Sequence, residues 1–252
     1  MRLVVFLMEL FVIHATTVRN SLHCIDLLYN NTPPSVGTRI LWGNGSPIGS
    51  IGSYGNETYL CFRGTLSVFD WVSDLDTDLV RYPYGGHVSR GFLDLYTRPY
   101  HLTVSKQVCI WPPLWGYCIS DSGIEEVLRE TSIREEILDV RINVVAGHSL
   151  GATLAILAGM DIFLGSTGTV LAFGSPMVGD PEFAEMYNSK GPRTYLIHTV
   201  DDIVPNFPMP CYRHVGRQII LNIPPGVCNI HKAHSMERYW ESLNLLESLI
   251  VL

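Results

Sequence analysis

The sequence predicts a single α/β domain with a mostly parallel central sheet flanked by helices. Three observations support this prediction. Apolar segments of strand type alternate with amphipathic helical segments along the chain, as in α/β domains. The chain has 252 residues and 47% of them are hydrophobic, which is enough for one sizeable core. No repeat, low-complexity block or linker divides it.

Helices and strands do not alternate regularly in the N-terminal half of the chain. An amphipathic helical segment opens the chain and ends near Asn30, before two prolines. Two strands joined around Gly55 follow, within SPIGSIGSYGNETYLCFRG. Helical patterns then cover 67–79, a stretch after Gly91, and 122–139, with the loop WPPLWGY before the last of them.

Strands and helices alternate more clearly in the C-terminal half, which supports a parallel sheet there. The expected order is strand 141–146, helix 152–164, strand 170–173, helix 181–187, strand 194–199, strand 218–221 and a final helix after His234.

The first twenty residues fit two descriptions. The run MRLVVFLMELFVIHA, residues 1–15, resembles a secretory signal peptide, with Arg2 as its basic region and Ala15 as the small residue before the cleavage site. Glu9 interrupts the run, which is also shorter than the roughly 20 apolar residues that span a bilayer. The alternative is an amphipathic first helix packed on the sheet. We therefore expect 1–20 to be a signal peptide or first helix, and 21–252 to form the domain.

Composition and cysteine usage bear on partners and compartment. The net charge of −7, with scattered charges, argues against a nucleic-acid partner. Six cysteines suit disulfides, and Cys109/Cys118 and Cys211/Cys228, which bracket Pro-containing loops, are the first candidate pairs. Cys61 lies in a strand-like run and is expected to be a plain buried thiol. Secretion is expected, with an intracellular location as the alternative. Three glycosylation sequons fit secretion: Asn30, Asn44 and Asn56.

A serine between two glycines is the strongest signal for chemistry. Gly147-His-Ser149-Leu-Gly151 fits G-x-S-x-G, with apolar INVVA before it and the helix former ATLAILAGM after it. This strand-turn-helix context is that of a nucleophile elbow, where a bulkier neighbour would clash with the crowded backbone. The alternative is a serine that merely caps a helix.

A serine nucleophile needs a base and an acid that orients the base, and in this type of fold the order is Ser, acid, His. Asp201 and Asp202 follow the strand-like RTYLIHTV. His231 and His234 lie near the C-terminus, also in the required order. The residues alone leave the choice within each pair open.

Five segments, in order from about Leu60 to Tyr239, resemble the class 3 lipase family of fungal triacylglycerol lipases and their plant relatives. The segments are CFRGTLSVFDWVSDL, GHSLGATLA, FGSPMVGDPEFA, DDIVPNFP and YRHVGRQIIL. The resemblance implies an α/β-hydrolase fold with a short helical lid. Two positions depart from the family pattern: Met177 stands where arginine is usual, and Ser89 where histidine is common.

The resemblance assigns roles to the candidate residues. It implies a catalytic triad of Ser149, Asp202 and His234, because Asp202 directly precedes Ile203-Val204-Pro205 in the family's D-x-V-P-x-x-P motif and HSMERYW fits its closing histidine. His231 remains a competing base, since i and i+3 share a helix face. His148 is expected to pack. The oxyanion donors would be Thr65, after the F-R-G strand, and the N–H of Leu150.

The segment after Thr65 bears on the substrate. Apolar residues recur with helical spacing from Val68 to Leu79, and together with the resemblance they predict a mobile amphipathic lid, for which a permanently packed surface helix is the alternative. These lid residues are Val68, Phe69, Trp71, Val72 and Leu75.

The expected function is carboxylic ester hydrolysis at a lipid–water interface, most of all that of a triacylglycerol lipase. A phospholipase of the A1 type and a soluble esterase are alternatives with the same machinery. A catalytically silent relative that binds lipid or a protein is the alternative from another class. Transient contact with a membrane or lipid droplet would accompany lipase activity. No cofactor is expected, and no metal, because the pair His231/His234 lacks an indicated third ligand.

Overall fold

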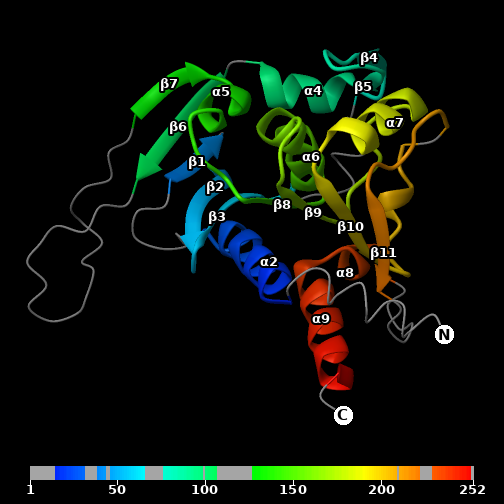
Figure 1. Cartoon of the computed structure of the whole chain (residues 1–252). Helices are drawn as coiled ribbons and strands as arrows, with labels where there is room; N and C mark the ends of the chain where they lie inside the picture. Colours follow the sequence, from blue (N-terminus) through cyan, green and yellow to red (C-terminus); the bar gives the residue numbers. More distant parts are fainter. Residues whose placement is uncertain are drawn as a thin grey trace, which may run out of the picture.

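A computed structural model describes residues 15–31, 39–43, 46–65, 76–98, 100–106, 127–208, 210–221 and 229–250 (Figure 1). Its helices are α2 (Ala15–Tyr29), α4 (Arg90–Thr97), α5 (Ile133–Ile137), α6 (Leu150–Phe163), α7 (Pro181–Lys190), the 3-10 turn η1 (Val204–Asn206), α8 (Ile230–Ala233) and α9 (Met236–Ile250). Its strands are β1 (Arg39–Gly43), β2 (Ser46–Tyr54), β3 (Glu57–Phe62), β4 (Leu79–Arg81), β5 (His87–Ser89), β6 (Tyr100–Lys106), β7 (Val127–Thr131), β8 (Val144–His148), β9 (Thr169–Phe173), β10 (Arg193–Thr199) and β11 (Arg217–Leu221).

Nine of these strands form one sheet in the order β11-β10-β9-β8-β3-β2-β1-β6-β7, and β4 pairs with β5 in a separate hairpin. The strands from β11 to β3 run parallel to one another. From β3 to β7 each neighbouring pair is antiparallel. The predicted α/β class is confirmed. The parallel half of the sheet contains β8, which leads into the turn at Ser149, and its two neighbours β3 and β9.

Helices cover both faces of the sheet (Figure 1). Helices α4, α6 and α7 lie on one face and share a core with it, while α2 and α9 lie on the other face over a second core. Helix α6 is apolar around most of its circumference, and all but two of its residues are buried, as expected for a helix enclosed by the fold.

Helix α2 takes in residues 15–20 of the predicted signal peptide or first helix, whereas residues 1–14 lie outside the described part of the chain. Val18 is buried against the sheet. Arg19 binds Glu247 and Asn244 on α9, and its guanidinium lies 5.6 Å from the centre of the Trp240 ring. None of the helices in the described ranges is long and apolar enough to span a bilayer.

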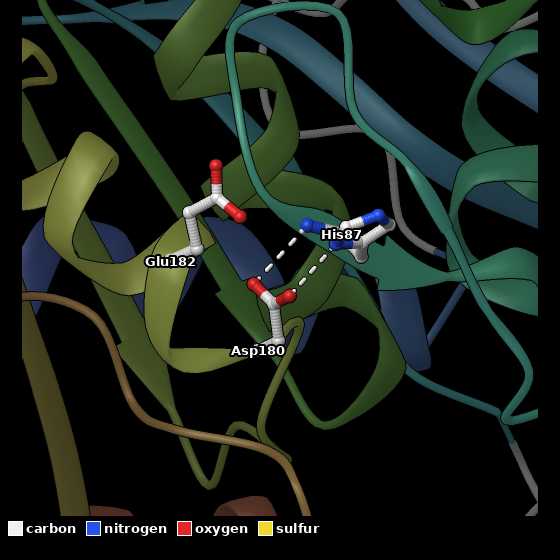
Figure 2. A group of neighbouring side chains, drawn as sticks. All are labelled: His87, Asp180 and Glu182. Carbon is white, nitrogen blue, oxygen red and sulfur yellow. Dashed lines mark hydrogen bonds and ion pairs between the residues drawn. The ribbon is translucent and has the colours of Figure 1, made fainter.

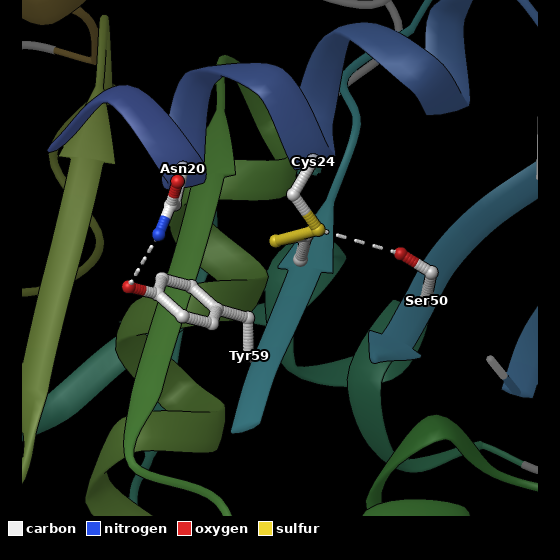
Figure 3. Close-up of a disulfide and its surroundings, with 5 residues drawn as sticks. Asn20, Cys24, Ser50 and Tyr59 are labelled. Atoms are coloured by element: carbon white, nitrogen blue, oxygen red, sulfur yellow. Dashed lines mark hydrogen bonds between the residues drawn. A yellow bond between two sulfur atoms is a disulfide. The ribbon is translucent and has the colours of Figure 1, made fainter. Parts of the chain in front are cut away.

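A disulfide between Cys24 and Cys61 joins α2 to β3 (Figure 3). The prediction of a plain thiol at Cys61 was therefore wrong. The reason is tertiary: Cys24, on the buried face of α2, comes to a Cα–Cα distance of 6.2 Å from Cys61. Cys211 has no disulfide partner within the described ranges, and its expected partner Cys228 lies outside them, as do Cys109 and Cys118.

Two predicted helices were wrong in part. Residues 127–131 form β7, which pairs with β6, and the helix begins only at Ile133. Ser132 starts this helix with a capping box, because its hydroxyl accepts from the Glu135 N–H and its own N–H donates to the Glu135 carboxylate. Leu79, the expected end of the helix at 67–79, instead begins β4; residues 66–75 lie outside the described ranges.

Candidate active site

Ser149 lies in the turn between β8 and α6 with a strained backbone, φ 59° and ψ −127°. A non-glycine residue in this region costs about 1–3 kcal/mol and persists only where the surroundings enforce it. The flanking glycines show the crowding. A Cβ on Gly147 would lie 2.1 Å from the Gly151 carbonyl oxygen, and one on Gly151 would lie 2.5 Å from that of Phe62. The strand-turn-helix geometry expected of G-x-S-x-G is therefore present.

The parallel strands bring the predicted residues to one edge of the sheet. Ser149 follows β8, Asp202 follows β10 and Thr65 follows β3, so all three lie beyond the carboxyl ends of their strands. Backbone hydrogen bonds link these ends, because the Ser149 N–H donates to the Phe173 carbonyl and the Gly174 N–H to that of Ile197, both at 2.9 Å.

Asp202 and His234 meet beside this edge. His234 lies between α8 and α9, and its Nδ1 is 2.8 Å from Asp202 Oδ2. The carboxylate also accepts from the Tyr239 hydroxyl at 2.6 Å and from the Val204 N–H at 3.0 Å. These three donors compensate the burial of the acid. A neutral imidazole that donates its Nδ1–H to a carboxylate carries a lone pair on Nε2, which is the arrangement that a general base requires.

The two atoms between which a triad would transfer a proton are Ser149 Oγ and His234 Nε2. Both are buried, and neither has a hydrogen-bond partner within the described ranges. A buried polar atom without a partner calls for an explanation, and a catalytic role is one. A nucleophile and its base often reach hydrogen-bonding geometry only when a substrate is bound.

The competing candidates lie elsewhere. Asp201 Oδ2 is 3.0 Å from the Arg238 guanidinium, in an ion pair that is almost buried. His231 is exposed on α8, one turn from the buried His234. Although Asp201 and His231 are close in sequence to the predicted pair, the structure joins Asp202 to His234.

The predicted oxyanion donors flank Ser149. Leu150 is the first residue of α6, where a backbone N–H has no partner inside the helix. Thr65 follows Gly64, and a Cβ on Gly64 would lie 2.6 Å from Ser149 Cβ, so the chain leaving β3 packs directly on the serine. The predicted lid residues, all between 66 and 75, lie outside the described ranges.

Three aromatic rings, those of Tyr29, His234 and Tyr239, lie close to the ring of His148. His148 is buried, and its ring centre lies 4.6 Å from that of His234 and 5.5 Å from that of Tyr239. Burial, together with the nearby His234, holds the pKa of His148 well below its usual value. Burial and the charge of Asp202 raise the pKa of the Tyr239 hydroxyl, which keeps it a donor. Sequence reasoning missed Tyr29 and Tyr239 as contacts of the site, although Tyr239 lies within the HSMERYW segment that carries the resemblance.

A second polar cluster joins β5 to α7. Figure 2 shows His87 facing Asp180, with Glu182 beside them, and their potential metal-binding atoms lie within 4.8 Å of one another. Asp180 Oδ1 accepts from the N–H groups of Phe183 and His87, and Oδ2 pairs with His87 Nδ1 at 2.8 Å. A cation here would displace these donors at the positive end of a helix dipole. The cluster is better explained as a cap of α7 that binds β5.

The comparisons with known proteins agree with this geometry. The sequence model of the family described as Lipase (class 3) matches residues 59–211. The chain is 27% identical over 218 residues to phospholipase A1-IIalpha of Arabidopsis thaliana, which covers 73% of this chain and 47% of that protein. It is also 28% identical over 202 residues to a lipase of Rhizomucor miehei, and this match covers 77% of this chain and 44% of that protein. The chain thus spans just under half the length of these two relatives.

A solved structure shares the fold. The native propeptide complex of Rhizomucor miehei lipase superposes with a TM-score of 0.55 at 24% identity, covering 82% of this chain and 66% of that one. The predicted α/β-hydrolase fold is therefore confirmed. With the family match extending over more than half of its length, the chain belongs to the class 3 lipase family.

Proposed function

We propose that this chain hydrolyses carboxylic esters of lipids, with triacylglycerol as the first candidate substrate, through a triad of Ser149, Asp202 and His234. The observation that carries the proposal is the strained Ser149 at the same sheet edge as the buried Asp202–His234 pair. A merely capping serine would have no need of a strained backbone, and Ser149 makes no side-chain cap hydrogen bond to α6. Family membership supports the same reading.

The mechanism follows from the contacts of the three residues. Ser149 Oγ attacks the ester carbonyl carbon while His234 Nε2 accepts the hydroxyl proton. Asp202 holds the imidazole by its Nδ1–H and stabilises the imidazolium that forms. The tetrahedral oxyanion would accept from the N–H of Leu150 and from Thr65. His234 returns its proton to the leaving alcohol. Water then attacks the acyl carbon while His234 takes a proton from it, and His234 passes this proton to Ser149 Oγ as the acyl–oxygen bond breaks, which releases the fatty acid and regenerates the serine.

Phospholipid is the second candidate substrate. The relative from Arabidopsis thaliana is named a phospholipase A1, whereas the one from Rhizomucor miehei is named a lipase. Both would use the same triad, so the head group is decided by residues that bind the substrate. The lid predicted between Leu66 and Leu79, which rests on the sequence, would favour water-insoluble esters of either kind.

The disulfide supports an oxidising compartment, and we extend the proposal to secretion. Cys24 and Cys61 are fully buried and joined, an arrangement typical of exported proteins. The contrary observation would be purification of the protein from its native cells with both cysteines as free thiols, measured by alkylation and mass spectrometry.

The test compares wild type with Ser149→Ala on emulsified triacylglycerol, phospholipid vesicles and a dissolved short-chain ester. We expect fatty-acid release from the emulsion by wild type only, rising above the solubility limit of the substrate. Release from vesicles alone would favour the phospholipase, and activity on the dissolved ester alone an esterase without a working lid. Equal inactivity of both folded proteins on all three substrates would overturn the proposal in favour of a silent binding protein.

A further inference from the structure

We propose that Tyr29, on the helix that precedes the sheet, is a positioning residue of the ester hydrolase: its hydroxyl sets the tautomer of His148 behind the catalytic histidine and holds the strand end that carries the oxyanion donor. The inference deepens the proposed function and rests on it for its kinetic test.

One oxygen atom makes both contacts. The Tyr29 hydroxyl accepts from the Gly64 N–H at 2.9 Å and lies 2.8 Å from His148 Nδ1. Gly64 precedes Thr65, and His148 precedes Ser149. A Cβ on Gly64 would lie 2.7 Å from the Tyr29 hydroxyl, so only a glycine allows the tyrosine to approach the backbone this closely. Tyr29 therefore joins the two backbone segments that hold the nucleophile and the oxyanion donor.

The hydrogen count assigns the tautomer of His148. Among the described residues the Tyr29 hydroxyl contacts the Gly64 N–H, which can only donate, and His148 Nδ1, so Nδ1 is the atom that accepts the hydroxyl proton. Tyr29 is partly buried, and desolvation raises the pKa of its hydroxyl, which keeps that proton in place. His148 is neutral, because burial lowers its pKa, so its single proton lies on Nε2.

The orientation of His148 matters because its ring packs on His234. The two ring centres are 4.6 Å apart and the planes are tilted by 30°. If the His148 ring rotated or changed its tautomer, the packing of His234, the proposed base, against that ring would change. The Tyr29 contact thus acts on His234 through the His148 ring, whereas Asp202 contacts His234 directly at Nδ1.

The disulfide fastens the same two elements that Tyr29 joins. Cys24 lies on α2 with Tyr29, and Cys61 lies on β3, whose continuation contains Gly64. The Tyr29 ring also contacts His148 edge-on at 5.7 Å. The disulfide therefore ties α2 to β3 within the same helix that contains Tyr29. This covalent link limits how far the Tyr29 hydroxyl can move from Gly64 and His148.

The test is Tyr29→Phe, which keeps the ring and removes the hydroxyl. We expect kcat on a dissolved short-chain ester to fall about tenfold with KM unchanged, the size expected for one hydrogen bond. The second readout is the ring ¹⁵N spectrum of labelled histidine, in which His148 signals are assigned by their loss in His148→Gln. Wild type should carry the His148 proton on Nε2, and Tyr29→Phe should lose this single tautomer.

Tyr59→Phe is the matched control. Its hydroxyl binds Asn20 on the same helix, at 3.5 Å, and donates to Glu57, so its removal also loosens α2 but leaves His148 and Gly64 untouched (Figure 3). We expect wild-type kcat and an unchanged His148 spectrum. Equal losses of kcat in Tyr29→Phe and Tyr59→Phe would overturn the proposal, because the effect would then be one of helix docking.

The outcomes separate this inference from the proposed function. Inactive wild type would overturn the ester hydrolase, but the His148 spectra would still decide the role of Tyr29. A wild-type His148 with its proton on Nδ1 would overturn the inference even if Tyr29→Phe failed to fold. Unchanged kcat and an unchanged spectrum in folded Tyr29→Phe would also overturn it, while leaving Ser149 as the proposed nucleophile.

Discussion

His234 and Asp202 meet in a hydrogen bond that is closed to solvent, with Nδ1 2.8 Å from Oδ2 and side-chain exposed fractions of 2% and 0%. A carboxylate this deeply buried must be compensated by donors, and Tyr239 and Val204 provide two more. The neighbouring Asp201 has a different partner, the Arg238 guanidinium. The two adjacent aspartates are thus chemically distinct, which makes them a matched pair for mutagenesis.

Asp202→Asn should lower kcat roughly 10³- to 10⁴-fold on an ester substrate, with little change in KM. The amide would no longer hold His234 with its proton on Nδ1. Asp201→Asn should keep kcat within about threefold, because it weakens an ion pair that does not contact His234. Steady-state kinetics on both variants check this, and a larger loss in Asp201→Asn would reverse the assignment of the acid.

Removal of the disulfide should cost stability. Cys24 and Cys61 are separated by 37 residues, and a loop of that length predicts about 3–4 kcal/mol less stability for Cys24→Ala/Cys61→Ala, on the chain-entropy view. Urea unfolding at pH 7 measures the difference. Cys211→Ala, at an exposed cysteine, is the control and should stay within about 0.5 kcal/mol of wild type. Equal midpoints for wild type and the double variant would contradict the prediction.

Buried His148 should make stability pH-dependent. Its pKa is lowered in the folded protein, so below pH 6.5 the unfolded chain binds more protons and the free energy of unfolding falls. The contribution is complete above the unfolded pKa and is lost as the pH falls. Relative to His148→Gln, wild type should lose up to about 1.4 kcal/mol per pH unit below pH 6.

Urea unfolding between pH 7.5 and 5 tests this dependence on His148. His23→Gln serves as the control because His23 is exposed on α2. This control should follow the wild-type slope throughout. Parallel curves for wild type and His148→Gln would show that His148 takes up its proton in the folded state as readily as in the unfolded one.

The Asp180 cap should matter more through its oxygen atoms than through its charge. Asp180→Ala leaves three donors without their acceptor and should cost about 2 kcal/mol, whereas Asp180→Asn keeps an oxygen for the cap and should cost under about 1 kcal/mol. Burial raises the pKa of Asp180, but the Phe183 and His87 donors outweigh it and leave the pKa below its usual value.

The sign of the Asp180 effect follows from that lowered pKa. The folded carboxyl binds fewer protons than the unfolded one, so its contribution is complete above about pH 4 and is lost as the pH falls further. Unfolding curves at pH 3 and 6 compare wild type with Asp180→Asn. The variant lacks the carboxyl and should lose less stability between these values; an equal loss would refute the assignment.

Much of the C-terminal half could be predicted from the sequence. The order from β8 to β10 follows from short apolar runs and intervening helical patterns, each of which reflects local periodicity. β7 was misjudged because VLRET mixes charges with apolar residues, and its pairing with β6 is a long-range contact that no local pattern reveals. Cys61 was misjudged for the same reason, since its partner lies on a distant helix.

The sequence by itself determined the elbow, because Gly147 and Gly151 are required by a turn between neighbouring elements. It also determined that an acid and a histidine follow in the order this fold needs. Only the tertiary structure decided that Asp202 meets His234 while Asp201 meets Arg238, and that Tyr29 contacts both His148 and Gly64. The physical reason is that hydrogen bonds and burial depend on which side chains the sheet brings within 3 Å, and parallel strands bring together residues far apart in the chain.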